Sequence, residues 1–213
     1  MPLKQLRYIV VEGPIGVGKT SLSRRLAQRL QAELILEQAE DNPFLARFYE
    51  DKRRYALAAQ LFFLLSRAEQ IRQLSQDDLF AGPKVADYLI DKDMLFARLN
   101  LDEAEFRLYQ KLYTDLRPQA PTPDLVIYLQ ASPTTLSQRV RRRGLNYEQG
   151  MSEAYLAELT RLYTEFFYHY DAAPLLIVNS ERLNFADSDE DFELLFQRIS
   201  EMRGAREFFN RGA

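Results

Sequence analysis

The residues whose chemistry is easiest to name form a glycine-rich run near the start of the chain. Gly13-Pro14-Ile15-Gly16-Val17-Gly18-Lys19-Thr20 matches G-x-x-x-x-G-K-[ST], a pattern whose backbone N–H groups cradle phosphates. In such a loop the lysine reaches the β- and γ-phosphates of a nucleoside triphosphate, and the threonine hydroxyl ligates Mg²⁺. We therefore predict that this run, with Ser21 after it, binds ATP or GTP. The alternative is an ordinary glycine turn.

The pattern binds phosphates only where a strand precedes the loop and a helix follows it. The flanking residues predict both elements. Residues 7–12 (RYIVVE) form a short apolar run that is typical of a buried strand. Residues 21–33 follow with Leu22, Leu26 and Leu30 at helical spacing. The N-terminus of that helix adds partial positive charge beside the phosphates.

Two carboxylates are candidates for the acceptor side of a phosphoryl transfer. Glu37 follows the second predicted strand (34–36), and Asp87 lies toward the end of the third (84–89). Ligands of an open parallel sheet sit beyond the carboxyl ends of its strands, so both acids are expected near the phosphates. An acid there can take a proton from an attacking hydroxyl or hold Mg²⁺. The alternative is that each acid caps a helix.

One face of the helix predicted over 54–73 has the chemistry to hold a flat heterocycle. Spacings of 3, 4 and 7 residues place four side chains on it: Gln60, Phe63, Leu64 and Arg67. An amide can bond the edge of a base in two places while an aromatic ring packs on its face, and buried polar groups need such partners. The alternative is a core stripe with Gln60 and Arg67 at its rim.

The densest positive charge falls at the end of another predicted helix. Four arginines lie there: Arg139, Arg141, Arg142 and Arg143. Three of them share a face by i+3 and i+4 spacing, and Gly144 ends the helix. In a chain of net charge −3, such a cluster could clamp a phosphoryl group in flight. The alternative is a solvated basic face.

Strands alternate with helices along the chain, which predicts an α/β fold with a parallel sheet. The five predicted strands cover residues 7–12, 34–36, 84–89, 124–130 and 175–179. The predicted helices cover residues 21–33, 54–73, 101–116, 132–143, 152–170 and 190–202. We therefore expect a five-stranded parallel sheet flanked by helices, in a single domain over residues 1–213.

Composition removes several classes of function. The 213 residues include no cysteine and one histidine, which excludes disulfides, thiolate or multi-histidine metal sites and a cysteine nucleophile. The net charge of −3 disfavours general nucleic-acid binding. No apolar run approaches the ~20 residues that span a bilayer, and no signal pattern precedes the glycine motif. These features favour a small-molecule enzyme of the cytoplasm.

Taken together, these motifs resemble those of the deoxyribonucleoside kinases, a family with the P-loop kinase fold, over nearly the whole chain. GPIGVGKTS at 13–21 resembles the family's form of the loop, and NPFLARFYED at 42–51 resembles its N-P…F-Y segment. QLFFLLSR at 60–67 resembles its Q-x6-R pair. RVRRRGLNYEQG at 139–150 resembles its arginine-rich lid.

The resemblance implies contacts to every part of the two substrates. It implies sugar contacts by Glu37, Tyr49 and Glu148; base contacts by Gln60 and Arg67; and phosphate contacts by Arg139 and Arg143. Phe63, from the same helix face as Gln60, and Phe96 are further candidates for the substrate pocket, and the alternative for Phe96 is a core residue. It also implies ATP and Mg²⁺ as cofactors, a donor adenine near residues 189–192, and a homodimer.

The sequence departs from the family after the third strand. The family's acid is followed by arginine and serine, whereas Asp87 is followed by Tyr88 and Leu89. The acid is kept, and we expect Lys92, about one helical turn further on, to take over from the missing arginine.

At two further positions the sequence matches the family pattern less closely. The resemblance places an aspartate near the base, which is Asp93 or its neighbour Asp91. A later arginine of the lid is replaced by Leu145, and Arg142 is the candidate to compensate.

The hypothesis is transfer of the ATP γ-phosphoryl group to the 5′-hydroxyl of a deoxyribonucleoside, with deoxyadenosine or deoxycytidine favoured. Asp87 would be the base, aided by Glu37, and would join Thr20 at Mg²⁺. Lys19 and the lid arginines Arg139 and Arg143 would stabilise the transferring charge. Two alternatives stay open: a nucleoside monophosphate kinase of the thymidylate kinase type, in which Arg67 neutralises an acceptor phosphate, and a nucleotide-binding switch without an acceptor pocket.

Overall fold

A parallel β-sheet runs through the centre of the computed structural model, which describes residues 6–76, 82–116, 120–148 and 150–211. Its strand order is β2-β3-β1-β4-β5-β6, and every neighbouring pair is parallel. The strands are β1 (Tyr8–Glu12), β2 (Glu33–Ile35), β3 (Lys84–Ala86), β4 (Leu125–Gln130), β5 (Leu175–Asn179) and β6 (Arg206–Asn210). The predicted α/β class and parallel sheet are confirmed.

The predicted number of five strands is wrong, because the sheet has a sixth strand at one edge. In β6, exposed and half-buried positions alternate, and Phe208 is 68% exposed. Edge strands need no continuous apolar run, since only one of their faces packs on the core. The sequence REFFN therefore carries little of the signal by which the central strands are recognised.

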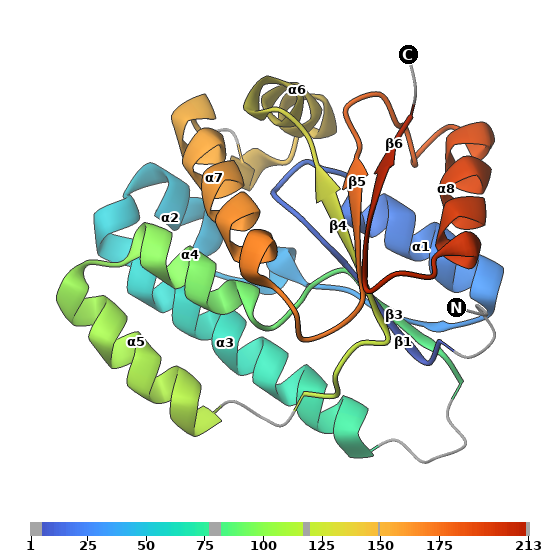
Figure 1. The fold of residues 1–213 in the computed structure, drawn as a ribbon. Helices are drawn as coiled ribbons and strands as arrows, with labels where there is room; N and C mark the ends of the chain where they lie inside the picture. Colours follow the sequence, from blue (N-terminus) through green and yellow to red (C-terminus); the bar gives the residue numbers. More distant parts are fainter. Residues whose placement is uncertain (1–5, 77–81, 117–119, 149, 212–213) are drawn as a thin grey trace.

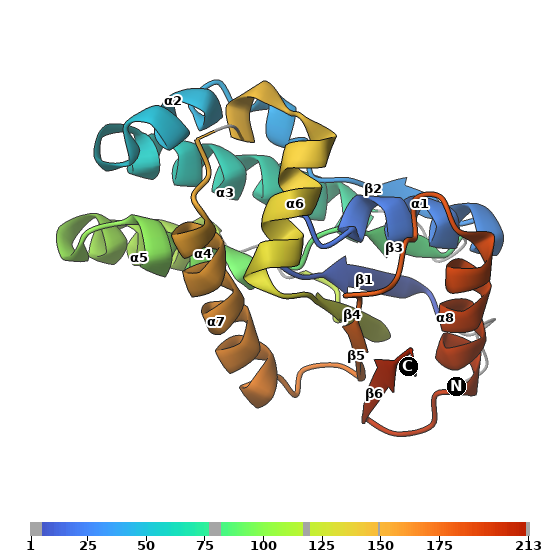
Figure 2. The ribbon, with the colours of Figure 1, turned by 90° about the horizontal axis from the view of Figure 1, so that it is seen from above.

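Helices cover both faces of the sheet (Figure 1). Their bounds are α1 (Lys19–Leu30), α2 (Leu45–Glu50), α3 (Lys52–Gln76), α4 (Lys92–Asn100), α5 (Glu103–Leu116), α6 (Pro133–Arg143), α7 (Glu153–His169) and α8 (Asp189–Glu201), with 3-10 turns at Ala39–Asp41 and Asn146–Glu148. Helices α1 and α8 lie on one face, and α4 and α7 lie on the other with α3 and α5 beyond them (Figures 1 and 2). Among the described residues, no helix is both long and apolar enough to cross a bilayer.

The two faces of β1 show why the helices divide in this way. Ile9 and Val11 join the core under α1 and α8, whereas Val10 joins the core under α4 and α7. All three side chains are at most 1% exposed. A strand covered on both faces reads as a continuous apolar run, which is how the sequence predicted it.

Two helices near the site were not predicted. Helix α4 lies between the third strand and the helix expected at 101–116, and α2 lies in the segment expected to contact the sugar. Helices α2 and α4 have 6 and 9 residues, which is too few turns for a helical period to stand out from the sequence. By contrast, α6 begins as predicted, with the Ser132 side chain accepting a hydrogen bond from Thr135 N–H and Gly144 ending the helix at φ 69°.

Candidate functional site

The glycine-rich run forms a tight loop between β1 and α1, as the phosphate-binding pattern requires. Gly13 and Gly16 have φ of 150° and 83°, and a Cβ on either would meet the carbonyl oxygens of Leu129 or Leu136 at 2.5 and 2.9 Å. Only glycine fits this close approach. Lys19 opens α1, and its ammonium donates hydrogen bonds to the carbonyl oxygens of Gly13 (2.7 Å) and Pro14 (3.2 Å). The lysine is thus folded back along the loop that would hold the phosphates.

Asp87 lies next to this loop, immediately after β3. One of its carboxylate oxygens accepts a hydrogen bond from the Thr20 hydroxyl at 2.6 Å, and the other accepts one from the Glu37 backbone N–H at 2.7 Å. Asp87 is only 3% exposed, so it is buried between these loops. Asp87 therefore joins the loop of β1 to the loop that follows β2.

The Glu37 carboxylate is held between two cations. It accepts a hydrogen bond from the Lys92 ammonium at 2.8 Å and forms an ion pair with the Arg67 guanidinium, which also pairs with Asp93. Burial alone would raise the pKa of Glu37, but Arg67 and Lys92 more than offset this and hold the pKa well below its ordinary value. The pairing with Arg67 identifies Asp93, rather than Asp91, as the aspartate in this network.

A cavity of about 1830 Å³ connects the loop to these charges. Its wall includes the predicted pocket residues Tyr49, Gln60, Phe63, Arg67 and Phe96, together with Glu37, Asp87 and Glu148. The Gln60 side chain is nearly buried, and no hydrogen bond within the described residues engages its amide. Lys92 is not part of the wall and reaches the cavity only through Glu37.

The far end of the cavity is closed by the segment after α6. Arg143 pairs with Glu148, and a Cβ on Gly150 would lie 3.0 Å from the Tyr49 carbonyl oxygen, so this segment packs closely on α2. Burial, with Tyr155 and Glu148 nearby, raises the pKa of Tyr49 well above its ordinary value. Its hydroxyl therefore stays protonated and can donate a hydrogen bond. Gln149, part of the predicted lid, lies outside the described residues.

The four clustered arginines do not act as one group. Arg139 donates hydrogen bonds to the carbonyl oxygens of Val17 (3.2 Å) and Ser180 (2.7 Å), which ties the phosphate loop to the segment after β5. Arg142 and Arg143 are exposed residues on the cavity wall, Arg143 with its guanidinium paired to Glu148, and Arg141 does not line it.

Several wall residues carried no recognisable sequence signal. Asn100 and Tyr155 contact each other at 3.4 Å across α4 and α7, and Tyr147 follows the lid helix. On the donor side, the wall is formed by residues 182–186 and not by residues 189–192, which pack against α1 through Arg25. Residues spread over different elements share a cavity only through the fold, so spacing could not have found them.

Comparison with known proteins agrees with this geometry. The family model for deoxynucleoside kinases matches residues 9–203. The chain belongs to the deoxynucleoside kinase family. It is therefore a phosphotransferase that phosphorylates deoxynucleosides with ATP as donor, a salvage reaction. It is 33% identical to a deoxyguanosine kinase of Bacillus subtilis over 92% of this chain and 97% of that protein, and 30% identical to a deoxyadenosine kinase of Lactobacillus acidophilus over 92% and 96%.

Solved structures of the same family share the fold. A deoxyadenosine kinase from M. mycoides with bound dCMP and dCDP superposes with a TM-score of 0.80 at 25% identity, covering 92% of this chain and all of that one. The same kinase with bound dATP superposes with a TM-score of 0.79. Among the relatives, names with guanine, adenine and cytosine substrates all occur, so the family does not by itself fix the base.

Proposed function

We propose that the protein transfers the ATP γ-phosphoryl group to the 5′-hydroxyl of a deoxynucleoside, with deoxyadenosine or deoxycytidine as acceptor. The observation that carries this proposal is the pairing of charges in the acceptor pocket. The buried Arg67 guanidinium pairs with Glu37 and Asp93, and Lys92 pairs with Glu37. An acceptor monophosphate would need a cation of its own, whereas these cations already have carboxylate partners, so the pocket suits an uncharged nucleoside.

The two carboxylates divide the work in this proposal. Asp87 is engaged by Thr20, so it serves the donor and metal side, whereas Glu37 faces the acceptor and takes the hydrogen bond of the 5′-hydroxyl. This shifts the base from Asp87 to Glu37. A low pKa is no obstacle, since the hydroxyl becomes strongly acidic as its oxygen bonds to phosphorus, late in a loose transition state. Lys19 and Arg143 would stabilise the transferring charge, and Arg139 would hold the phosphate loop against the segment after β5.

The residues present fit Mg²⁺. This ion prefers oxygen ligands and is usually held by one or two protein groups together with substrate phosphates. The Thr20 hydroxyl and the Asp87 carboxylate, 2.6 Å apart at the phosphate loop, supply such a pair. When bound there, Mg²⁺ would neutralise charge on the β- and γ-phosphates. ATP is an intracellular donor, so we place the reaction in the cytoplasm.

The preferred base follows from the Gln60 amide. An amide offers one acceptor and a neighbouring donor, which matches the amino group and ring nitrogen of adenine or cytosine. Guanine adds a second donor beside its acceptor and first donor, so an amide can satisfy only part of its edge, and the nearby Asp93 carboxylate that could accept from the extra donor is already paired with Arg67. Phe63 and Phe96 line the cavity from α3 and α4 and would pack on the faces of the base.

The decisive experiment is a phosphorylation assay with ATP and MgCl₂ over the four deoxynucleosides, their ribose counterparts and their 5′-monophosphates. We expect turnover of deoxyadenosine or deoxycytidine to exceed that of deoxyguanosine and thymidine by at least tenfold, with no turnover of monophosphates. Preferred turnover of a monophosphate would overturn the proposal in favour of the monophosphate kinase alternative. Slow ATP hydrolysis without any acceptor would favour the switch.

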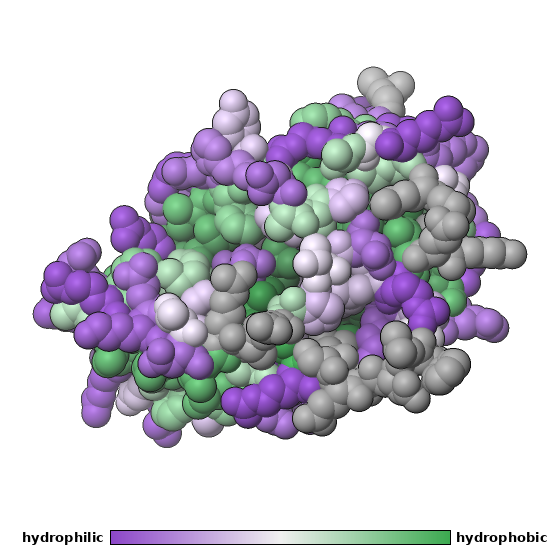
Figure 3. Space-filling view, turned by 60° about the horizontal axis from the view of Figure 1, so that its bottom comes forward, coloured by the Kyte–Doolittle hydropathy of each residue, from purple (hydrophilic) through white to green (hydrophobic). Residues whose placement is uncertain are grey.

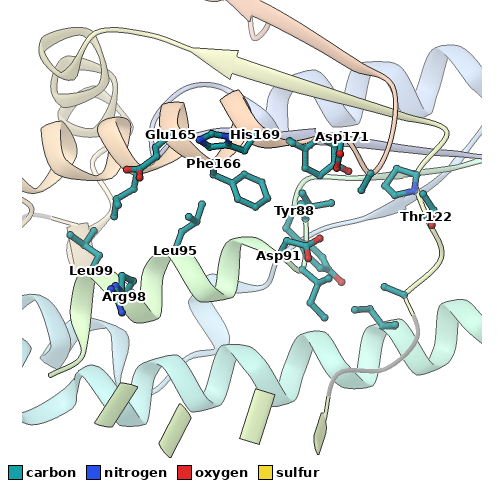
Figure 4. Close-up of a pocket in the computed structure, with 18 of the residues that line it drawn as sticks. Tyr88, Asp91, Leu95, Arg98, Leu99, Thr122, Glu165, Phe166, His169 and Asp171 are labelled. Atoms are coloured by element: carbon teal, nitrogen blue, oxygen red, sulfur yellow. The ribbon is translucent and has the colours of Figure 1, made fainter. Parts of the chain in front are cut away.

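We further propose that residues 1–213 form one catalytic domain with a lid near 139–150, and that the protein is a homodimer. The second copy would cover a cavity of about 1250 Å³ between α4 and α7. Figure 4 shows Leu95, Leu99 and Phe166 facing one another there, with Arg98 and Glu165 at the rim. Figure 3 shows apolar side chains gathered within a hydrophilic frame on the underside of the molecule.

A face that carries charges of both signs around an apolar centre can pair with a second copy of itself across a two-fold axis. Light scattering should give twice the chain mass of 24.9 kDa, and Leu99→Glu should give the chain mass itself. A monomeric wild type would contradict the dimer without affecting the proposed reaction.

A further inference from the structure

The last residue of β1, Glu12, is a buried acid that the reaction described above does not use. It is fully buried, lies directly before the phosphate loop and is not part of the cavity wall. Its carboxylate accepts three hydrogen bonds. The donors are Gly13 N–H at 2.8 Å and Tyr163 O–H at 3.0 Å on one oxygen, and Leu89 N–H at 2.7 Å on the other.

Two of these donors belong to the two loops that meet in the reaction. Gly13 begins the loop that would hold the donor phosphates. Leu89 lies between β3 and α4, two residues after Asp87 and three residues before Lys92, which in turn holds Glu37. Because β1 and β3 are neighbours in the sheet, the two loops leave it side by side. The Glu12 carboxylate is thus a bridge between them.

The residue type fits this bridge. A carboxylate accepts hydrogen bonds on both oxygens, whereas an amide of the same shape would turn an NH₂ group toward one of the N–H donors. Bonds from N–H groups to a charged acceptor are about twice as strong as neutral ones, and more so in a dry interior. The side chain is also just long enough for each oxygen to reach a different loop.

We propose that Glu12 is a positioning residue that sets the spacing between the phosphate loop and the segment that carries Asp87 and, through Lys92, holds Glu37. The inference rests on the proposed function, because the segment between β3 and α4 carries Asp87, assigned to the metal, and leads to Lys92, which holds the acceptor carboxylate Glu37. A misplacement of about 1 Å between reacting groups can lower a rate by 10²-fold without weakening the binding of either substrate. Loss of the bridge should therefore lower kcat and leave both KM values nearly unchanged.

The test compares three variants of the full-length protein. Glu12→Gln removes one loop contact, and Glu12→Asp keeps the charge but is too short to bridge both loops. Tyr163→Phe removes the third donor and leaves both loop contacts in place, so it is the matched control. We expect kcat to fall at least tenfold in both Glu12 variants, KM for ATP and for the nucleoside to change less than threefold, and kcat of Tyr163→Phe to stay within threefold of wild type.

Unchanged kcat in Glu12→Gln would overturn the inference. Normal kcat in Glu12→Asp would show that the charge rather than the bridge matters. An equal loss of kcat in Tyr163→Phe would show that packing of the core, and not the contact with the loops, sets the rate. Either result would also overturn the inference.

Amide hydrogen exchange gives a readout that does not depend on activity or on full stability of the variants. The Gly13 and Leu89 amides should exchange at least tenfold faster in Glu12→Asp than in wild type, relative to other amides of β1 and β3, and unchanged exchange would contradict the bridge. Failure of the proposed function would appear differently, as absent deoxynucleoside turnover in the wild-type protein.

Discussion

The donor loop and the acceptor pocket are built on opposite principles. The donor loop is one continuous run, Gly13 to Ser21, which would bind phosphates through backbone N–H groups and one lysine. The acceptor pocket draws Glu37, Gln60 and Phe96 from three separate segments, and its charges are already paired inside the protein. Backbone N–H groups recognise any triphosphate, whereas a fixed set of side chains recognises one kind of molecule. The contrast places generic affinity at the donor loop and selectivity at the acceptor pocket.

The largest expected effect comes from the residue that joins the two regions. Replacing Asp87 with Asn removes the charge at Thr20 while keeping the shape of the side chain. We expect kcat to fall at least 100-fold with ATP binding nearly intact, because the loop itself is unchanged. Steady-state kinetics and equilibrium ATP binding measure both quantities. Asp115→Asn, on the exposed surface of α5, is the control and should leave kcat unchanged. Near-normal kcat in Asp87→Asn would break the link between the regions.

If the acceptor pocket alone recognises the nucleoside, a substitution of Gln60 should raise the KM for the nucleoside and leave the KM for ATP unchanged. Gln60→Leu removes two hydrogen bonds to the base, worth about 1–3 kcal/mol together. We expect KM for the nucleoside to rise about tenfold, since 1.4 kcal/mol is a factor of ten. KM for ATP should stay within twofold, and Gln110→Leu on α5 should change neither value. Equal changes in both KM values would contradict the division between the regions.

The lid arginines should show a smaller, donor-side effect. Arg143 is about half exposed and pairs with Glu148, so its charge is well screened by solvent. We expect Arg143→Gln to lower kcat/KM for ATP about threefold to tenfold. Arg141→Gln, in the same helix but away from the cavity, should change it less than twofold. An equally large effect of Arg141→Gln would show that the cluster acts only through its overall positive charge and not through a contact of Arg143 in the cavity.

The smallest expected effect is on the stability of the folded protein, and it arises from the paired charges of the acceptor pocket alone. Arg67 and Lys92 hold the pKa of Glu37 below its ordinary value of 4.5, so the ionised form stabilises the fold. This stabilisation is present above about pH 4.5 and is lost as the pH falls through the lower pKa of the folded state. Glu37→Gln should therefore destabilise the protein more at pH 7 than at pH 3, by at least about 1 kcal/mol. Denaturant unfolding at both values measures this, and equal losses would contradict the paired state of Glu37.

The sequence predicted the two regions to different depths for a physical reason. The donor loop is local, so spacing alone places Lys19 and Thr20, and the alternating apolar runs predicted the parallel sheet. Edge strand β6 lacks such a run and helix α4 is too short to show a helical period, so both were missed. In the acceptor pocket, the stripe of Gln60 and Arg67 was visible on one helix. The pairing of Arg67 with Asp93 and of Lys92 with Glu37 depends on how α3, α4 and the segment after β2 meet, which no spacing encodes.

The contacts of Arg139 show the same limit. A cluster of arginines predicts a phosphate clamp, but the fold directs Arg139 onto the carbonyl oxygens of the phosphate loop and the segment after β5. Charge density can be read from the sequence, whereas the direction of each guanidinium requires the structure.

The most direct test of the acceptor pocket is a crystal structure of the protein with deoxyadenosine. We predict the adenine between Phe63 and Phe96 with its edge on Gln60, and the 5′-hydroxyl within hydrogen-bonding distance of Glu37. A nucleoside bound elsewhere, or a pocket filled by the protein's own side chains, would contradict the account.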